Sequence, residues 1–112
     1  MRQLLFAFVA LLTGSLASPD LADAQEPAIT IVIRNHRFEP AEIRVPANKR
    51  ISITVHNDDP TPEEFESTQM KVEKVIPGKS KATIRIGPLA PGRYPFVGEF
   101  NEATAKGVVI AE

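Results

Sequence analysis

The residues of this 112-residue chain that could do chemistry are mainly carboxylates, gathered in two stretches. Glu63, Glu64 and Glu66 precede Met70 in one stretch, and Glu99 stands in the other, between a glycine and a phenylalanine. Carboxylate oxygens are hard ligands that suit iron, manganese or calcium and give Cu(II) a weaker site, whereas the thioether of methionine is a soft ligand for Cu(I). The candidate metal ligands of the chain are therefore Glu63, Glu64, Glu66, Met70 and Glu99.

Other interpretations of these residues stay open. The acidic stretches, with Glu73 and Glu102 close by in sequence, can be solvated loops in which a glutamate pairs with Lys71, Lys74 or Lys106. A single methionine in this part of the chain can also be a core residue. His36 and His56 each end a predicted strand, and they could share a metal only if those strands are neighbours.

The elements that must position these side chains are short strands. Apolar residues alternate with polar ones through 29–34 and 51–56, and shorter segments of the same kind recur between turn residues, at 42–45, 71–76, 83–86, 94–98 and 108–111. Residues 58–70 are expected to form a long connection, with at most one helical turn over 61–66. This pattern predicts an all-β fold, a Greek-key antiparallel β-sandwich of about seven strands.

One turn carries a more specific prediction. Pro91 and Gly92 stand just ahead of Tyr94. In β-sandwiches this arrangement is typical of a tyrosine corner, in which the phenol hydrogen-bonds to the backbone a few residues upstream and fixes a connection between the sheets. We expect Tyr94 to make that bond, and Phe65 and Phe96 to lie in or near the core.

The first residues are predicted to be a targeting segment. A basic residue, Arg2, precedes the apolar run 4–12, and Ala22, Asp23 and Ala24 form a small-residue cleavage site. The run is shorter than the roughly 20 residues that span a bilayer. We therefore expect a cleaved signal peptide at 1–24, one domain at 25–112 and a periplasmic location; cleavage after Ala17 and an uncleaved membrane anchor are the alternatives.

Composition excludes several function classes. Removing Arg2, Asp20 and Asp23 with the leader takes the counts from 13 basic and 14 acidic residues to 12 of each, so nothing favours nucleic acid as a partner. The chain has no cysteine, hence no disulfide and no thiolate for catalysis or metal binding. No nucleophile motif or glycine-rich phosphate loop is present, which favours a binding protein over an enzyme.

The ordered strands and turns resemble a cupredoxin, and in particular the EfeO-type cupredoxin-like domains associated with bacterial periplasmic iron uptake. The resemblance covers nearly all of residues 25–112. It rests on Phe38-x-Pro40, Val45-Pro46-Ala47, Asn57, Glu64-Phe65-Glu66-Ser67, Glu73-Lys74-Val75 with Pro77-Gly78, Pro88-Leu89-x-Pro91-Gly92-x-Tyr94-x-Phe96, Glu99-Phe100 and Gly107.

The resemblance also implies where a copper site would lie. Blue-copper cupredoxins bind the metal through two histidines, a cysteine and a weak axial methionine. Carried onto this chain, those positions fall near Glu63, at Gly98, at Asn101 and near Ala105, and none of these residues is a ligand of the required type. The resemblance therefore implies a cupredoxin-like protein without a type 1 copper centre.

For function, the resemblance implies a metal-handling or docking module accessory to iron or copper uptake. Its partners would be a metal ion, held in a site that is not type 1, and a membrane permease or another periplasmic iron-transport protein. Two alternatives stay open: a copper-dependent accessory that oxidises ferrous iron for transport, and a metal-free protein-interaction sandwich.

Overall fold

The computed structural model describes residues 26–112, so the predicted leader lies outside the described residues and its cleavage stays a prediction. Within that range the chain forms nine strands and one 3-10 turn. In order they are β1 (Ala28–Arg34), β2 (Arg37–Glu39), β3 (Glu42–Val45), β4 (Ile51–Asn57), β5 (Glu63–Ser67), β6 (Val72–Ile76), β7 (Ser80–Ile86), β8 (Gly92–Gly98), η1 (Glu99–Asn101) and β9 (Lys106–Ala111).

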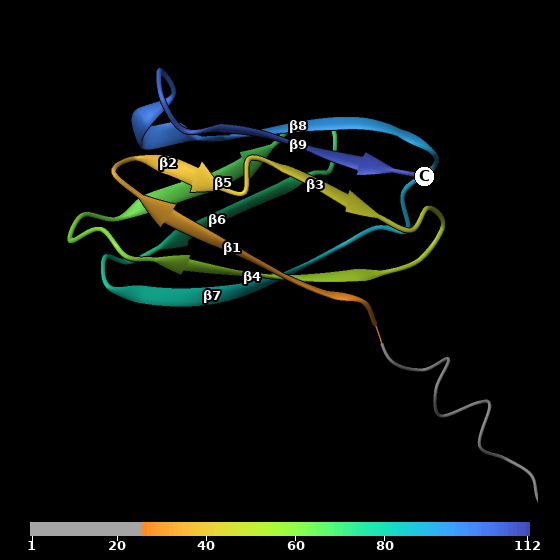
Figure 1. The fold of residues 1–112 in the computed structure, drawn as a ribbon, viewed down its shortest axis with the longest axis horizontal. Coiled ribbons are helices and arrows are strands. Elements are labelled where there is room, and N and C mark those ends of the chain that lie inside the picture. The colour runs from red at the N-terminus through yellow and green to blue at the C-terminus, as the bar shows by residue number, and fades with distance from the viewer. Residues whose placement is uncertain (1–25) are drawn as a thin grey trace, which may run out of the picture.

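The strands make two sheets that face each other (Figure 1). One sheet has the order β2-β1-β4-β7, and the other has the order β3-β9-β8-β5-β6. The predicted all-β sandwich is confirmed. It has nine strands rather than about seven, and both sheets are mixed, because β1 pairs with β4 and β3 pairs with β9 in parallel. No helix in the described range has the length and apolar character needed to cross a bilayer.

The core lies between the sheets and is built by the predicted alternation. In β4, Ile51, Ile53 and Val55 are buried and alternate with partly exposed polar residues, as expected for a strand with one face on a core. The opposite sheet contributes the stacked rings of Phe65 and Phe96, whose centroids are 4.7 Å apart. Phe65 on β5 and Phe96 on β8 thus pack two neighbouring strands of this sheet against each other.

The predicted tyrosine corner is confirmed. The Tyr94 hydroxyl donates a 2.7 Å hydrogen bond to the carbonyl oxygen of Ala90, and the ring packs beside Gly92. This contact fixes the start of β8. The far end of β8 runs into η1, which Figure 1 shows at one end of the sandwich.

Candidate functional site

Residues 58–70, which were expected to be a connection, contain the strand β5. Neighbouring glutamates of a strand face opposite sides of the sheet. Glu63, Phe65 and Ser67 point into the sandwich, whereas Glu64 and Glu66 alternate with them and are only half-buried. The expectation of an irregular connection over all of 58–70, with a helical turn, was wrong. The sequence does not predict β5, because two of its three inward residues are polar. This removes the apolar alternation that identifies a half-buried strand.

Glu63 is a buried carboxylate whose hydrogen-bond partners are N–H donors. It is only 1 % exposed. Its Oε1 accepts hydrogen bonds from the backbone amides of Glu64 and Phe100, both at 2.9 Å, and its Oε2 accepts one from the side-chain amide of Asn101 at 2.7 Å. A buried carboxylate is tolerated when its lone pairs are satisfied in this way. Glu63 therefore ties β5 to η1 across the end of the sandwich.

The four positions at which the resemblance implies copper ligands do come together. Glu63 bonds to Asn101, and a methyl group added at Gly98 would lie 2.6 Å from Cδ of Glu63 and 2.7 Å from Cβ of Ala105. The Gly98 amide also donates to the Ala105 carbonyl oxygen at 2.9 Å. The side chain of Glu63 fills this space. Only a glycine at position 98 leaves room for it.

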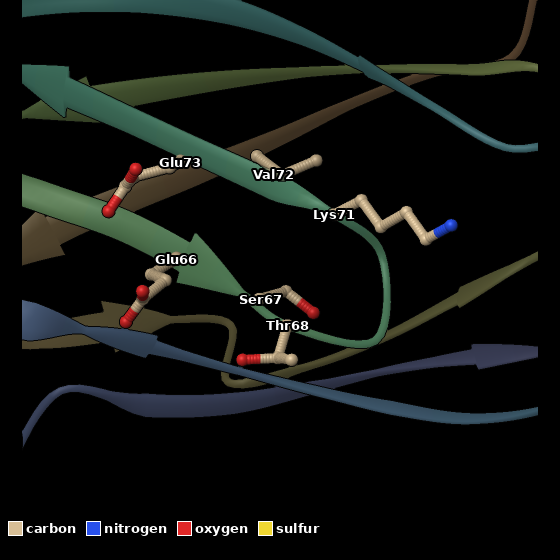
Figure 2. A pocket seen from close by; sticks show the side chains of 6 residues that line it. All are labelled: Glu66, Ser67, Thr68, Lys71, Val72 and Glu73. Carbon is tan, nitrogen blue, oxygen red and sulfur yellow. The ribbon is translucent and has the colours of Figure 1, made fainter.

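A second group of carboxylates lies on the outer face of the same sheet. Oxygens of Glu64, Glu73 and Glu99 all lie within 4.8 Å of one another, and no other such group of three His, Cys, Asp or Glu side chains is found among residues 26–112. The pairing of β5 with β6 puts Glu66 directly opposite Glu73, on the same face. Figure 2 shows these two side chains next to each other on adjacent strands, beside an open pocket. Residues Glu64, Glu66, Glu73 and Glu99 are here called the acidic cluster.

The carboxylates of the acidic cluster repel one another. The side-chain hydrogen bond with Glu99, partial burial, and the negative charges of Glu99, Glu73 and Glu66 raise the pKa of Glu64 to about 7. Partial burial and the charges of Glu99 and Glu73 also raise the pKa of Glu66. Carboxylates this close cannot all ionise without cost, and the raised pKa of Glu64 reflects that cost.

No basic side chain neutralises the acidic cluster within the described part of the chain. The ion pairs found there involve other acidic residues, so the predicted alternative pairings with lysines 71, 74 and 106 are not observed. Lys71 lines the same pocket as Glu66 and Glu73, but Figure 2 shows its side chain extending away from both carboxylates.

The five predicted metal-site residues thus fall into three places. Glu64, Glu66 and Glu99 belong to the acidic cluster. Glu63 lies inside the sandwich, with its oxygens hydrogen-bonded, and Met70 is 8 % exposed and belongs to the apolar core. Glu73 was the member of the cluster that the prediction left out. The hairpin register of β5 and β6 is the signal that could have found it.

His36 and His56 are not part of the acidic cluster. The condition for their approach is met, because β1 and β4 are neighbours. However, His36 lies in the turn beyond the end of β1, where its Nδ1 is 3.5 Å from a carboxylate oxygen of Asp59. His56 lies within β4, next to Lys81 of β7.

Comparison with known proteins agrees with this fold. The cupredoxin-like domain family matches residues 3–111. A protein of Rickettsia prowazekii (strain Madrid E), named uncharacterized protein RP394, is 36 % identical over 92 residues, which cover 82 % of this chain and 74 % of the relative.

Solved structures share the architecture at low sequence identity. The metal-binding domain of the Cu(I)-exporting P-type ATPase CopA from Streptococcus pneumoniae D39 has a TM-score of 0.68 and 22 % identity, covering 76 % of this chain and 84 % of that domain. Auracyanin A, a blue copper protein from Chloroflexus aurantiacus, has a TM-score of 0.65 and 12 % identity, covering 79 % of this chain and all of that chain. The family match and the shared sandwich lead to one conclusion: this chain belongs to the cupredoxin-like family.

Proposed function

We propose that this protein is an exported cupredoxin-like module that holds a metal ion through the acidic cluster, without a type 1 copper centre, and serves a metal-uptake system of the EfeO type. The observation that carries the proposal is the group of Glu64, Glu73 and Glu99, whose oxygens lie within 4.8 Å of one another without a basic partner in the described range. The proposed ion is iron. The proposed partner of the protein is a membrane permease or another periplasmic transport protein.

The residues at the interior positions do not fit type 1 copper. That centre needs a thiolate and two imidazoles, and the chain has no cysteine at all. The oxygens of Glu63 already accept three hydrogen bonds, Asn101 donates one of them, and Gly98 and Ala105 offer no ligand atom. We infer that the hydrogen-bonded carboxylate of Glu63 joins β5 to η1 in place of a bound metal ion.

The acidic cluster has the chemistry of a site for a hard or borderline cation. Three carboxylates from two strands and η1 can contribute oxygens to one ion, which would replace the proton on Glu64 and offset the repulsion between the carboxylates. Because Glu64 has a pKa of about 7, a cation competes with a proton there, and we expect its affinity to rise as the pH increases through 7. The copper-dependent oxidation alternative draws no support from Met70, which lies in the core.

Calorimetric titration tests the proposal. The purified protein is titrated with Fe(II), Mn(II), Cu(II) and Cu(I), beside a Glu64→Gln/Glu99→Gln variant and a control variant, Glu112→Gln, which removes a carboxylate outside the cluster. Glu112 is exposed and pairs with Arg44, away from the cluster. We expect binding of Fe(II) or Mn(II) by the wild type and the control, and its loss in the double variant. Equal binding by all three proteins, or none by the wild type, would refute the metal site and leave a protein-interaction sandwich.

A further inference from the structure

Two residues that adjoin members of the acidic cluster, one by strand pairing and one in sequence, have exposed apolar side chains. Val75 and Phe100 are the large hydrophobic residues that stand out from the described surface, with 47 % and 52 % of their areas exposed. Val75 on β6 is paired with Glu64 across the sheet, and Phe100 directly follows Glu99 in η1. An aromatic ring exposed beside a group of charges is typical of a contact surface between proteins.

Phe100 is held in its exposed position by the interior of the protein. Its backbone amide donates to the buried carboxylate of Glu63 at 2.9 Å. The loop that follows is also anchored, because the Ala105 amide bonds to the Asn101 carbonyl oxygen at 2.8 Å and the Thr104 hydroxyl bonds to the His36 carbonyl oxygen at 2.6 Å. A ring on an anchored turn loses little backbone freedom when a partner covers it, so binding needs less ordering.

The charge around this ring selects the class of partner. Glu64, Glu66 and Glu73 lie on the same sheet face as Val75, and the carboxylate of Glu99 reaches them from η1. Glu102 is close enough to act on the pKa of Glu66. Negative charge of this density repels nucleic acid and anionic lipid headgroups. A second copy that offered the same face would also be repelled. A cationic protein surface is the partner whose approach relieves the repulsion.

We infer that Phe100, Val75, Glu102 and the acidic cluster form a docking face for a basic protein segment, in which Phe100 enters an apolar pocket rimmed by lysine or arginine side chains. The inference rests on the docking part of the proposed function and names the chemistry of the partner. It does not depend on metal binding, because the carboxylates attract a cationic segment whether or not they also hold an ion.

NMR titration of the isotope-labelled protein tests the docking face. The probe is a synthetic peptide that alternates lysine and leucine, compared with oligolysine and with a peptide that alternates glutamate and leucine, all with a chelator present so that metal plays no part. We expect the lysine–leucine peptide to shift the amide signals of Phe100, Val75 and the acidic cluster. The affinity should fall about tenfold in Phe100→Ala, but not in Thr83→Ala, an exposed residue of the opposite sheet.

Each other outcome overturns the inference. Signals that shift mainly elsewhere would place the contact on another face, and unchanged affinity in Phe100→Ala would show that charge alone attracts the peptide. Self-association that disappears in Phe100→Ala, measured by sedimentation, would identify a second copy as the occupant. Since Phe100 contributes no metal ligand, its variant should still bind metal in calorimetry, which separates failure of the docking face from failure of the metal site.

Discussion

The carboxylate of Glu63 accepts a 2.7 Å hydrogen bond from the side-chain amide of Asn101, across 38 residues of sequence. The two residues occupy positions where the family resemblance implies histidine ligands. A hydrogen bond between a buried carboxylate and a partly buried amide thus joins these two positions. Its contribution to stability can be measured directly.

Replacing Glu63 with leucine should destabilise the protein by about 3 kcal/mol, because three N–H donors that now bond to the carboxylate would lose their acceptor. Glu63→Gln should lose less, since one oxygen remains to accept hydrogen bonds. Urea unfolding monitored by circular dichroism gives both values. The exposed Glu112→Gln control should change the free energy of unfolding by less than about 0.5 kcal/mol, and a Glu63→Leu effect no larger than this would disprove the role of Glu63.

The pH dependence of stability should report the acidic cluster. Glu64 has a pKa raised from 4.5 to about 7 in the folded protein. The folded state therefore holds this proton more tightly than the unfolded state, and the resulting stabilisation is complete below pH 4.5 and is lost as the pH rises through 7. The Glu64→Gln/Glu99→Gln variant should lose less stability than the wild type between about pH 5 and about pH 8. Urea unfolding at the two pH values checks this, and parallel behaviour of the two proteins would contradict it.

The tyrosine corner should contribute a modest, local amount. Tyr94→Phe removes only the hydroxyl that donates to Ala90 at 2.7 Å, and we expect a loss of about 1 kcal/mol in the free energy of unfolding. Thermal and urea unfolding should both show it. A variant as stable as the wild type would mean that water replaces the hydroxyl without loss.

Position 98 should tolerate nothing larger than glycine. In Gly98→Ala the added methyl group would lie 2.6 Å from Glu63 and 2.7 Å from Ala105, so these neighbours must move, and we expect a loss of about 1–3 kcal/mol. Gly92→Ala is the matched control, because its methyl group would meet Tyr94 at an ordinary 3.6 Å. Similar unfolding midpoints for both variants would show that the end of the sandwich is loosely packed.

Much of the fold could be predicted because its signals are local. The alternation in β4 and the turn ahead of Tyr94 each lie within a few residues, and the structure confirms both. The parallel pairings of both sheets depend on contacts between distant segments, which periodicity does not reveal.

The candidate site was predicted only in part, because some of its contacts also join segments that are distant in the sequence. Clustered glutamates at 63–66 pointed to the correct strand, but its alternation sends Glu63 inward and Glu64 outward. Glu63 can be buried only because Phe100 and Asn101 supply donors, and these follow much later in the chain. Glu73 joins the cluster through the register of a hairpin, which was not assigned from the sequence.

The position of β9 affects the order in which the protein can be completed during synthesis. Among residues 26–112, β9 is the last strand in the sequence, yet it lies between β3 and β8 and is the sole sheet neighbour of β3. Residues 42–45 leave the ribosome early, but they have no strand to pair with until residues 106–111 follow. Without residues 106–111, β3 would lose its strand partner and β8 would lose one of its two, so the five-stranded sheet cannot be completed before these residues are synthesised.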